Sequence, residues 1–507
     1  MTDLPTTLAG APTGLQTDLY QLTMAQGYWT LGRAEDQAVF HLGFRRHPFQ
    51  RATKGAGGFA LACGLEQAVE LIEGLGFSPE QRAFLGGLQG NDGAALFDPA
   101  FLDWLGELRP SVDLDAMPEG TACFAHEPLL RVRGPLLQCQ LLETGLLTIL
   151  NFQTLIATKA ARIAAAAEGD AVLEFGLRRA QGLDGGLSAS RAAYVGGCIG
   201  TSNVAAAARF GIPVRGTHAH AWVMAFDDER EAFAAYADAM PNNCVFLVDT
   251  YDTLRGVDRA IEIGLELRGR GHEMVGVRLD SGDLASLSRA ARAKLDAAGF
   301  PAAKVVASND LDEYRIRALK AAGAAIDVWG VGTRLVTAYD QPALGGVYKL
   351  SALRPDPGAP WRRTLKLSDT ASKTSTPGIL QVHRLRTRAG TALVDVVFDE
   401  EFGPPQLGDA PTPVEAIHPS RTDHTSEADH TNLPAAGEVV VEALLQPVLR
   451  EGRRVAPAPT LAAIRERALA EVASLPEAVR RIDAAGAYPV TLELRLAELK
   501  RGLIAAH

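Results

Sequence analysis

The sequence predicts an α/β protein whose central part forms a parallel β/α barrel. Short runs rich in β-branched residues recur there, and several are followed by a stretch with helical spacing of apolar residues. Four runs have starts spaced 29, 29 and 21 residues apart, at Val245, Met274, Ala303 and Ala324. Strands alternating with helices in this way are typical of β/α units. Two earlier runs, from Ala171 and Gly211, bring the units to six, which favours a barrel, regular or irregular.

The elements before and after this part divide the chain further. Leu19 to Trp29 has helical spacing behind a cap at Thr17 or Asp18, and AVFHLGF alternates as a strand does. The longest helical pattern runs from Leu141 to Ala167. The predicted domains are a loose arm (1–15), an α/β domain (16–140) onto which a β-rich segment (351–400) packs, an α/β barrel with the active site (141–350), a Pro- and His-rich loop (403–437) and a helical tail (438–507).

Composition excludes several classes of protein. The 507 residues include 50 basic and 60 acidic side chains, a formal net charge of −10, so no general attraction to nucleic acid or acidic membranes is expected. Five cysteines without a CxxC pair indicate neither disulfides nor a thiolate zinc site. No uninterrupted apolar run reaches the length of a membrane span, and no secretory leader is visible. We therefore expect a soluble cytoplasmic protein without a nucleic-acid or membrane partner.

The ends of the predicted strands carry the candidate site, because loops and helix N-termini converge there in a parallel barrel. In VGVRLD the alternation puts Arg278 and Asp280 on one face. They are either a buried ion pair or, as we favour, contacts to a phosphate and to sugar hydroxyls. Gly330, Gly332 and Thr333 follow a late strand and are either a tight turn or a phosphate loop.

A histidine pair and an arginine pair add further candidates. His218 and His220 in GTHAHAWV could be packed side chains, metal ligands, or a base or phosphoryl acceptor oriented by Asp249. No additional Cys or His is spaced to complete a metal site. In EFGLRRAQG, Arg178 is either a solvated surface residue or a partner for a ligand carboxylate, with Phe175 stacking on a flat heterocycle.

Ten motifs in order resemble the nicotinate phosphoribosyltransferase family of type II phosphoribosyltransferases. They include TDLYQLTMAQGYW, FHLGFRRHPF, EFGLRRAQG, GTHAHAWV, VGVRLDSGDL, IDVWGVGTRL and KTSTPG, and the likeness covers about Leu15 to Arg384. It implies an N-terminal α/β sandwich-like domain beside an irregular α/β barrel, and a homodimer with shared active sites.

The resemblance also implies the reaction. Nicotinate and phosphoribosyl pyrophosphate would give nicotinate mononucleotide and pyrophosphate, with Mg²⁺ as cofactor and with ATP hydrolysis coupled through a phosphohistidine, in NAD salvage by the Preiss-Handler pathway. The Mg²⁺ would be held mainly through substrate phosphates.

Residue by residue, the resemblance makes His220 the phosphorylated histidine and Asp249 its orienting carboxylate, with Arg278 and Asp280 at the ribose phosphate. The remaining substrate contacts that it implies are Tyr20 (from the neighbouring subunit), Phe175 and Arg178 for the base, Ser308, Asn309, Gly330, Gly332 and Thr333 for the 5′-phosphate, and Lys349, Lys373 and Arg45 or Arg46 for pyrophosphate.

Ser202 favours nicotinate over nicotinamide as the base. It stands where nicotinamide-using relatives carry an aspartate, and a serine removes a repulsion against the carboxylate of nicotinate. There are three alternatives. The acceptor could be nicotinamide or quinolinate, the protein could be a catalytically silent nucleotide-binding regulator, or it could be a hydrolytic barrel enzyme.

Overall fold

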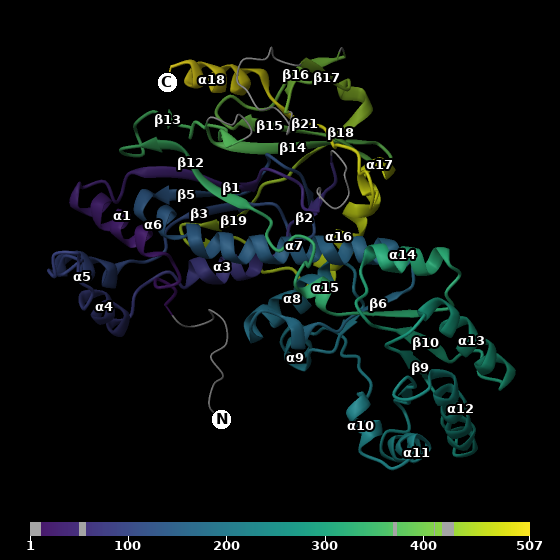
Figure 1. The fold of residues 1–507 in the computed structure, drawn as a ribbon. Coiled ribbons are helices and arrows are strands. Elements are labelled where there is room, and N and C mark those ends of the chain that lie inside the picture. Colours follow the sequence, from purple (N-terminus) through teal and green to yellow (C-terminus); the bar gives the residue numbers. More distant parts are fainter. Residues whose placement is uncertain (1–11, 50–56, 369–372, 410, 418–429, 507) are drawn as a thin grey trace. The chain divides into compact units, whose positions relative to one another are not determined.

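The structure is a computed structural model that describes residues 12–49, 57–368, 373–409, 411–417 and 430–506 (Figure 1). The chain forms two compact units. The first contains residues 1–155 and 343–507, and the second is Ile156–Pro342. Most of the predicted arm (1–11) and part of the predicted Pro- and His-rich loop (410 and 418–429) lie outside the described residues.

The first unit is built on two large sheets. Its helices are α1 Leu19–Thr30, α3 Leu65–Glu73, α4 Pro79–Gly86, α5 Pro99–Glu107, α6 Leu136–Leu141, α16 Leu461–Ser474, α17 Glu477–Arg480 and α18 Leu494–Ala505, with a 3-10 turn at Ala436–Glu438. Its strands are β1 Gln37–Phe44, β2 Ala60–Leu61, β3 Asp113–Ala116, β4 Ala122–Cys123, β5 Pro128–Pro135, β12 Gly346–Arg354, β13 Arg362–Arg363, β14 Leu380–Thr387, β15 Ala392–Asp399, β16 Thr412–Ala416, β17 His430–Leu433, β18 Val439–Ala443, β19 Gln446–Arg450, β20 Arg453–Arg454 and β21 Val490–Leu492.

Strands from distant parts of the chain pair in both sheets. One sheet has the antiparallel order β13-β12-β1-β5-β3-β19-β20. The other has the order β17-β16-β21-β15-β14-β18, in which only β15 and β21 run parallel. β2 and β4 form a separate pair. β12, β14 and β15 therefore join the first unit, in keeping with the β-rich character predicted for 351–400.

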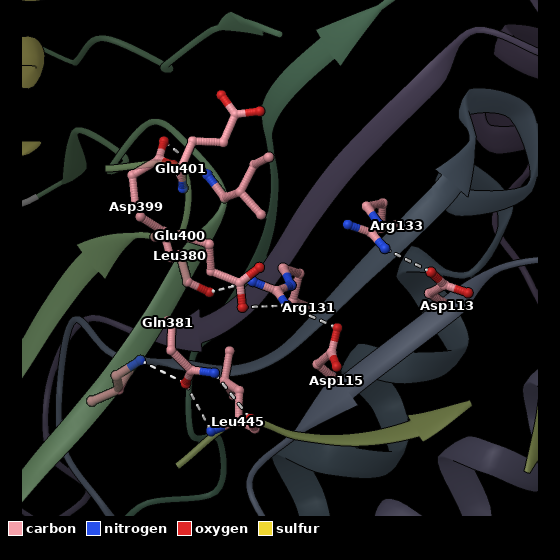
Figure 2. A network of polar contacts seen from close by, with 12 residues as sticks. Asp113, Asp115, Arg131, Arg133, Leu380, Gln381, Asp399, Glu400, Glu401 and Leu445 are labelled. Atoms are coloured by element: carbon pink, nitrogen blue, oxygen red, sulfur yellow. Dashed lines mark hydrogen bonds and ion pairs between the residues drawn. The ribbon is translucent and has the colours of Figure 1, made fainter. Parts of the chain in front are cut away.

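A buried arginine on β5 links the two sheets (Figure 2). The Arg131 guanidinium donates to Asp115 on β3 and to Glu400, both at 2.9 Å, and to the carbonyl oxygen of Leu380 on β14 at 3.1 Å. Arg131 is 4% exposed, so these charge-assisted bonds lie away from water. They fix β14 against the sheet that contains β5.

The second unit confirms the predicted α/β class and the parallel strands. Its strands are β6 Ala171–Glu174, β7 Gly200–Thr201, β8 Val245–Leu247, β9 Gly276–Leu279, β10 Lys304–Ala307 and β11 Val328–Val331. Its helices are α8 Leu183–Val195, α9 Val204–Phe210, α10 His220–Met224, α11 Glu229–Ala239, α12 Thr253–Gly269, α13 Leu284–Ala297, α14 Glu313–Ala321 and α15 Thr333–Val336, with the 3-10 turn η1 Leu177–Arg179. Helix α7 Glu143–Ala167 begins in the first unit and ends in the second.

All pairs in this sheet are parallel, in the order β7-β6-β11-β10-β9-β8. Among the described residues no strand pairing joins β7 to β8, so the barrel is open and irregular. Its core strands are buried, as Val277, Leu279 and Val305 illustrate. Helices α12 and α13 pack on β9 (Figure 1).

Three predicted segments differ in the structure. The run from Gly211 forms only an isolated bridge, between Val214 and Thr201. The segment 403–437 contains β16 and β17 where we expected a loop, because Val414 and Leu433 are buried in a small core with Val396. The tail 438–507 begins with β18, β19 and β20 before the expected helices. Within the described part of the chain, no helix has the length and hydropathy needed to cross a bilayer.

Candidate functional site

Arg278 on β9 and Asp280, the first residue after β9, form the centre of the candidate site. The register places Arg278 beside Leu247 of β8 and Val306 of β10. Its Nε donates to Ser308 Oγ at 3.1 Å and its Nη1 donates to Thr217 Oγ1 at 3.0 Å. Asp280 Oδ1 lies 3.6 Å from Arg278 Nη2 and accepts from Ser308 Oγ. The two predicted side chains therefore lie together. This arrangement is compatible both with an ion pair and with contacts to a phosphate and to sugar hydroxyls.

His220 lies beside this pair at the start of α10. Its Nε2 is 3.8 Å from Asp280 Oδ2, and its Nδ1 is 3.2 Å from Thr250 Oγ1. The side chain is 41% exposed, so the imidazole can be reached from solvent. The contact of Nδ1 with Thr250 orients the ring, and Nε2 stays accessible. Such a nitrogen can act as a phosphoryl acceptor or as a base.

Asp249, which the resemblance makes the orienting carboxylate of His220, forms hydrogen bonds with other residues. Its Oδ2 accepts from the backbone N–H of Asp280 at 2.9 Å and from Ser281 Oγ at 2.6 Å. Its Oδ1 is buried and has no hydrogen-bond partner among the described residues. Asp249 therefore holds the turn after β9, while Thr250 is the residue that contacts His220. Thr250 was not among the predicted residues. The feature of the sequence that could have indicated it is a hydroxyl side chain directly after Asp249.

His218 is a packed histidine. Its Nε2 accepts from the backbone N–H of Leu247 at 3.3 Å, and its ring lies 4.8 Å from that of Tyr236. Burial lowers the pKa of His218 to about 4. It is therefore neutral at pH 7.

This low pKa predicts a loss of stability in acid. The unfolded chain binds the proton first, because its histidine pKa is about 6.5, so stability falls as the pH drops from there toward 4. Between pH 7 and pH 5 the loss due to His218 is roughly 2 kcal/mol. We expect His218→Gln, which keeps an acceptor for Leu247, to show a correspondingly flatter pH dependence of the unfolding free energy in urea titrations. His272→Gln is the control, and equal slopes for wild type and His218→Gln would contradict the prediction.

The glycine-rich segment at the end of β11 contacts the base-binding candidate Phe175. A Cβ on Gly330 would lie 2.6 Å from Phe175 Cδ2, and one on Gly332 would lie 3.2 Å from Phe175 O. The Phe175 N–H donates to Val331 O at 2.8 Å. Thr333 begins α15 immediately afterwards. Only glycine lets the Phe175 ring approach the end of β11 this closely.

The loop after β10 has a strained backbone. Asn309 and Asp310 adopt φ values of +92° and +46°, in the left-handed region that Asn and Asp tolerate better than most residues. Ser308, just before them, belongs to the Arg278 cluster. Such strain is concentrated at functional sites.

Arg178 and Ser202 lie on neighbouring segments beside β6. Arg178 is exposed on η1, and its guanidinium has no hydrogen-bond or ion-pair partner within the described residues. The Ser202 N–H donates to Glu174 O at 3.0 Å. An exposed guanidinium without a partner is compatible with binding of a ligand carboxylate.

Four predicted residues belong to the first unit. The Arg45 guanidinium donates to Lys373 O at 3.0 Å, so these two segments meet. Lys349 Nζ donates to Tyr348 O and lies 3.6 Å from Glu143 Oε1. Partial burial and the Glu143 charge raise the pKa of Tyr20, which is exposed on α1.

Comparison with known proteins shows similarity to nicotinate phosphoribosyltransferases along most of the chain. Three family models match, the nicotinate phosphoribosyltransferase N-terminal domain at residues 15–151, the nicotinate phosphoribosyltransferase family at 171–359 and the corresponding C-terminal domain at 380–500. Nicotinate phosphoribosyltransferase of Bacillus subtilis is 50% identical over 372 residues, 73% of either chain.

Human relatives match over almost the whole chain. The nicotinate phosphoribosyltransferase of Homo sapiens is 36% identical over 547 residues, which cover 97% of this chain and 96% of that one. The crystal structure of human nicotinic acid phosphoribosyltransferase superposes with a TM-score of 0.79 at 35% identity, over 96% of this chain and 99% of the human one. Sequence and fold therefore agree over both units.

Proposed function

Because the chain belongs to the nicotinate phosphoribosyltransferase family, we propose that it transfers the phosphoribosyl group of phosphoribosyl pyrophosphate to nicotinate. The products are nicotinate mononucleotide and pyrophosphate. The observation that carries the proposal is the cluster of Arg278, Asp280, Ser308 and His220 at the ends of β9 and β10 and the start of α10. It supplies a cation, a carboxylate, a hydroxyl and an accessible imidazole to one substrate.

The charges of this cluster suit the transfer. Cleavage of the anomeric bond leaves positive charge on the ribose and negative charge on the departing pyrophosphate. The Arg278 guanidinium stabilises phosphate oxygens, and the Asp280 carboxylate accepts from ribose hydroxyls and faces the developing positive charge. Ser308 orients both side chains through its hydroxyl. Positioning of nicotinate opposite the leaving group supplies much of the remaining catalysis.

The base and the 5′-phosphate take adjacent positions. Phe175 stacks on the pyridine ring, and Arg178 binds the nicotinate carboxylate beside Ser202. Gly330, Gly332 and Thr333 hold the 5′-phosphate with Ser308 and Asn309. The contact between Gly330 and Phe175 supports this arrangement, because it links the two subsites within one unit.

His220 couples ATP hydrolysis to this reaction. Phosphorylation adds a charge of about −2 beside Asp280, which changes the affinity of the site for the anions that it binds. The Thr250 hydroxyl at Nδ1 leaves Nε2 as the nitrogen that takes the phosphoryl group.

His220→Ala is expected to abolish the stimulation of product formation by ATP while leaving transfer without ATP. The reason is that no other accessible imidazole lies beside Asp280 among the described residues. The measurement is pyrophosphate release from nicotinate and phosphoribosyl pyrophosphate, with and without ATP. His272→Ala serves as the control, and full stimulation in His220→Ala would exclude the phosphohistidine.

Mg²⁺ fits this site as an ion held mainly by substrate. Among the described residues no three Cys, His, Asp or Glu side chains gather as a metal site. Mg²⁺ in nucleotide sites commonly keeps one or two carboxylates and otherwise binds phosphate oxygens and water, and Asp280 would supply such a carboxylate. When bound, it neutralises charge on the pyrophosphate.

The same proposal includes the setting of the enzyme. It acts in the cytoplasm in the Preiss-Handler route of NAD salvage, as a homodimer whose sites take Tyr20 from the neighbouring subunit and pyrophosphate contacts from Arg45, Lys349 and Lys373. Five buried cysteines without a disulfide support a reducing compartment.

One assay tests the proposed function. Nicotinate, nicotinamide and quinolinate are each supplied with phosphoribosyl pyrophosphate, and pyrophosphate release is followed with and without ATP. We expect release with nicotinate. Release with nicotinamide or quinolinate but not with nicotinate would identify a different base as the substrate. Release with none of the three would overturn the proposal.

A further inference from the structure

A fully buried carboxylate lies directly behind the proposed base-binding segment. Glu174 ends β6 and has 0% exposure, and it immediately precedes Phe175. Within the described residues no Lys, Arg or His side chain pairs with it. Buried carboxylates without a cation are costly unless several donors satisfy them. We propose that Glu174 is a positioning residue that sets the geometry of the nicotinate subsite, an inference that rests on the proposed function.

One oxygen of Glu174 holds the backbone that leads to Arg178. Its Oε1 accepts from the backbone N–H of Gly176. The turn continues through the Arg179 N–H, which donates to Gly176 O at 2.8 Å. A Cβ on Gly176 would lie 2.3 Å from Val336 Cγ1 and 3.0 Å from Glu174 Oε1, so this approach requires glycine. The carboxylate therefore orders the turn that carries Phe175 and Arg178.

The other oxygen holds the segment that carries Ser202. Glu174 Oε2 accepts from Ser190 Oγ on α8 at 2.8 Å and from Thr201 Oγ1 on β7 at 2.5 Å. Ser202 follows Thr201, and its own N–H donates to Glu174 O. One side chain thus ties together α8, β7 and the turn after β6.

Asn203 completes this network. Its N–H donates to Thr201 Oγ1 at 2.9 Å, and its Nδ2 donates to Ser190 Oγ at 3.1 Å. Both hydroxyls therefore accept from Asn203 and can give their hydrogens to Glu174. A carboxylate, which only accepts, matches these donors. Glutamine in its place would keep one acceptor oxygen only, so its amide N–H groups would face either the Gly176 N–H or the hydroxyls of Ser190 and Thr201, and all of these groups already donate.

Kinetics of Glu174→Gln and Thr201→Val test this role. Neither change removes a group that contacts substrate in the proposed site, but both disturb the relative placement of Phe175, Arg178 and Ser202. We expect the KM for nicotinate to rise about tenfold or more, because small misplacements of binding groups are expensive. The KM for phosphoribosyl pyrophosphate should rise much less than the KM for nicotinate. Equal increases in both KM values, or none in either, would contradict the proposal.

Glu313→Gln is the matched control. Glu313 is also a fully buried carboxylate of the second unit, but it pairs with Lys159 at 2.7 Å and with Arg162 at 2.8 Å. Its loss lowers stability without acting on the turn after β6. We expect the ratio of the two KM values to be that of the wild type in this variant. An increase confined to nicotinate in Glu313→Gln would show that general destabilisation explains the effect and would overturn the proposal.

Hydrogen exchange gives a second readout that needs no activity. In Glu174→Gln the amides of residues 175–180 should exchange faster, while those of α12 should keep the wild-type rate. Unchanged exchange at 175–180 would overturn the proposal. If the wild-type protein does not use nicotinate, the proposed function fails, but the exchange experiment still decides whether Glu174 orders this turn.

Discussion

Arg278→Met is expected to lower kcat/KM for phosphoribosyl transfer by about 100- to 1000-fold, the loss seen when a preorganised donor to developing charge is removed. The guanidinium is held by Ser308 and Thr217, so it meets the phosphate oxygens without reorganisation. Methionine fills a similar volume but offers no donor and leaves Asp280 without its cation. Steady-state kinetics with nicotinate and phosphoribosyl pyrophosphate measure the effect.

Two further variants separate charge from geometry. Arg278→Lys keeps the positive charge but loses the planar fork that reaches two hydroxyls at once, so its activity should lie between those of wild type and Arg278→Met. Arg268→Gln changes an exposed arginine of α12 that pairs with Glu273, and it should behave as wild type. Activity of Arg278→Met within a few-fold of wild type would remove Arg278 from the proposed site.

Arg384→Leu is expected to destabilise the first unit by about 3–5 kcal/mol, because it leaves a buried charge without its partner. Arg384 and Asp395 both have 0% side-chain exposure, and two hydrogen bonds, of 2.8 Å and 2.5 Å, join them across β14 and β15. Arg384 also donates to Glu471 on α16 at 2.9 Å and to Ala122 O at 2.8 Å. Urea unfolding followed by circular dichroism measures the loss.

A double variant tests the origin of that cost. Replacing both partners, as Arg384→Leu with Asp395→Leu, removes the unpaired charge and should recover part of the stability. Arg495→Gln, at an exposed arginine that pairs with Glu493, is the control and should unfold at nearly the wild-type urea concentration. Equal stability of Arg384→Leu and wild type would contradict the assigned role.

The parallel sheet could be predicted because its strands are buried on both faces and therefore appear as continuous apolar runs. The ends of the sheet could not. β7 is only Gly200–Thr201, too short to form a pattern. The run from Gly211 is interrupted by Pro213, which lacks the N–H that a strand needs, and Val214 is exposed. Short edge strands depend on neighbours that the local sequence does not specify.

The residues of the site could be predicted better than their partners. Strand alternation was enough to bring Arg278 and Asp280 together, whereas the hydrogen bond of Asp249 to Ser281 and that of His220 to Thr250 depend on the loops that follow the strands. Asp252 and Asp283, which also follow predicted strands, cap α12 and α13. Glu174 is an acid at the end of an apolar strand, a visible signal whose meaning depends on hydroxyls 16 and 27 residues further along the chain.

The second unit is a continuous insertion in the first, and this has a consequence for synthesis on the ribosome. All strands of its sheet lie between residues 171 and 331, so they have all been made once its last residue, Pro342, has been added. The sheet that contains β1 and β5 must wait for β12 and β19, more than 200 residues after β1 in the chain. Domains fold as units during synthesis. The first unit, although its synthesis begins earlier, can therefore complete its folding only after the second unit has been made.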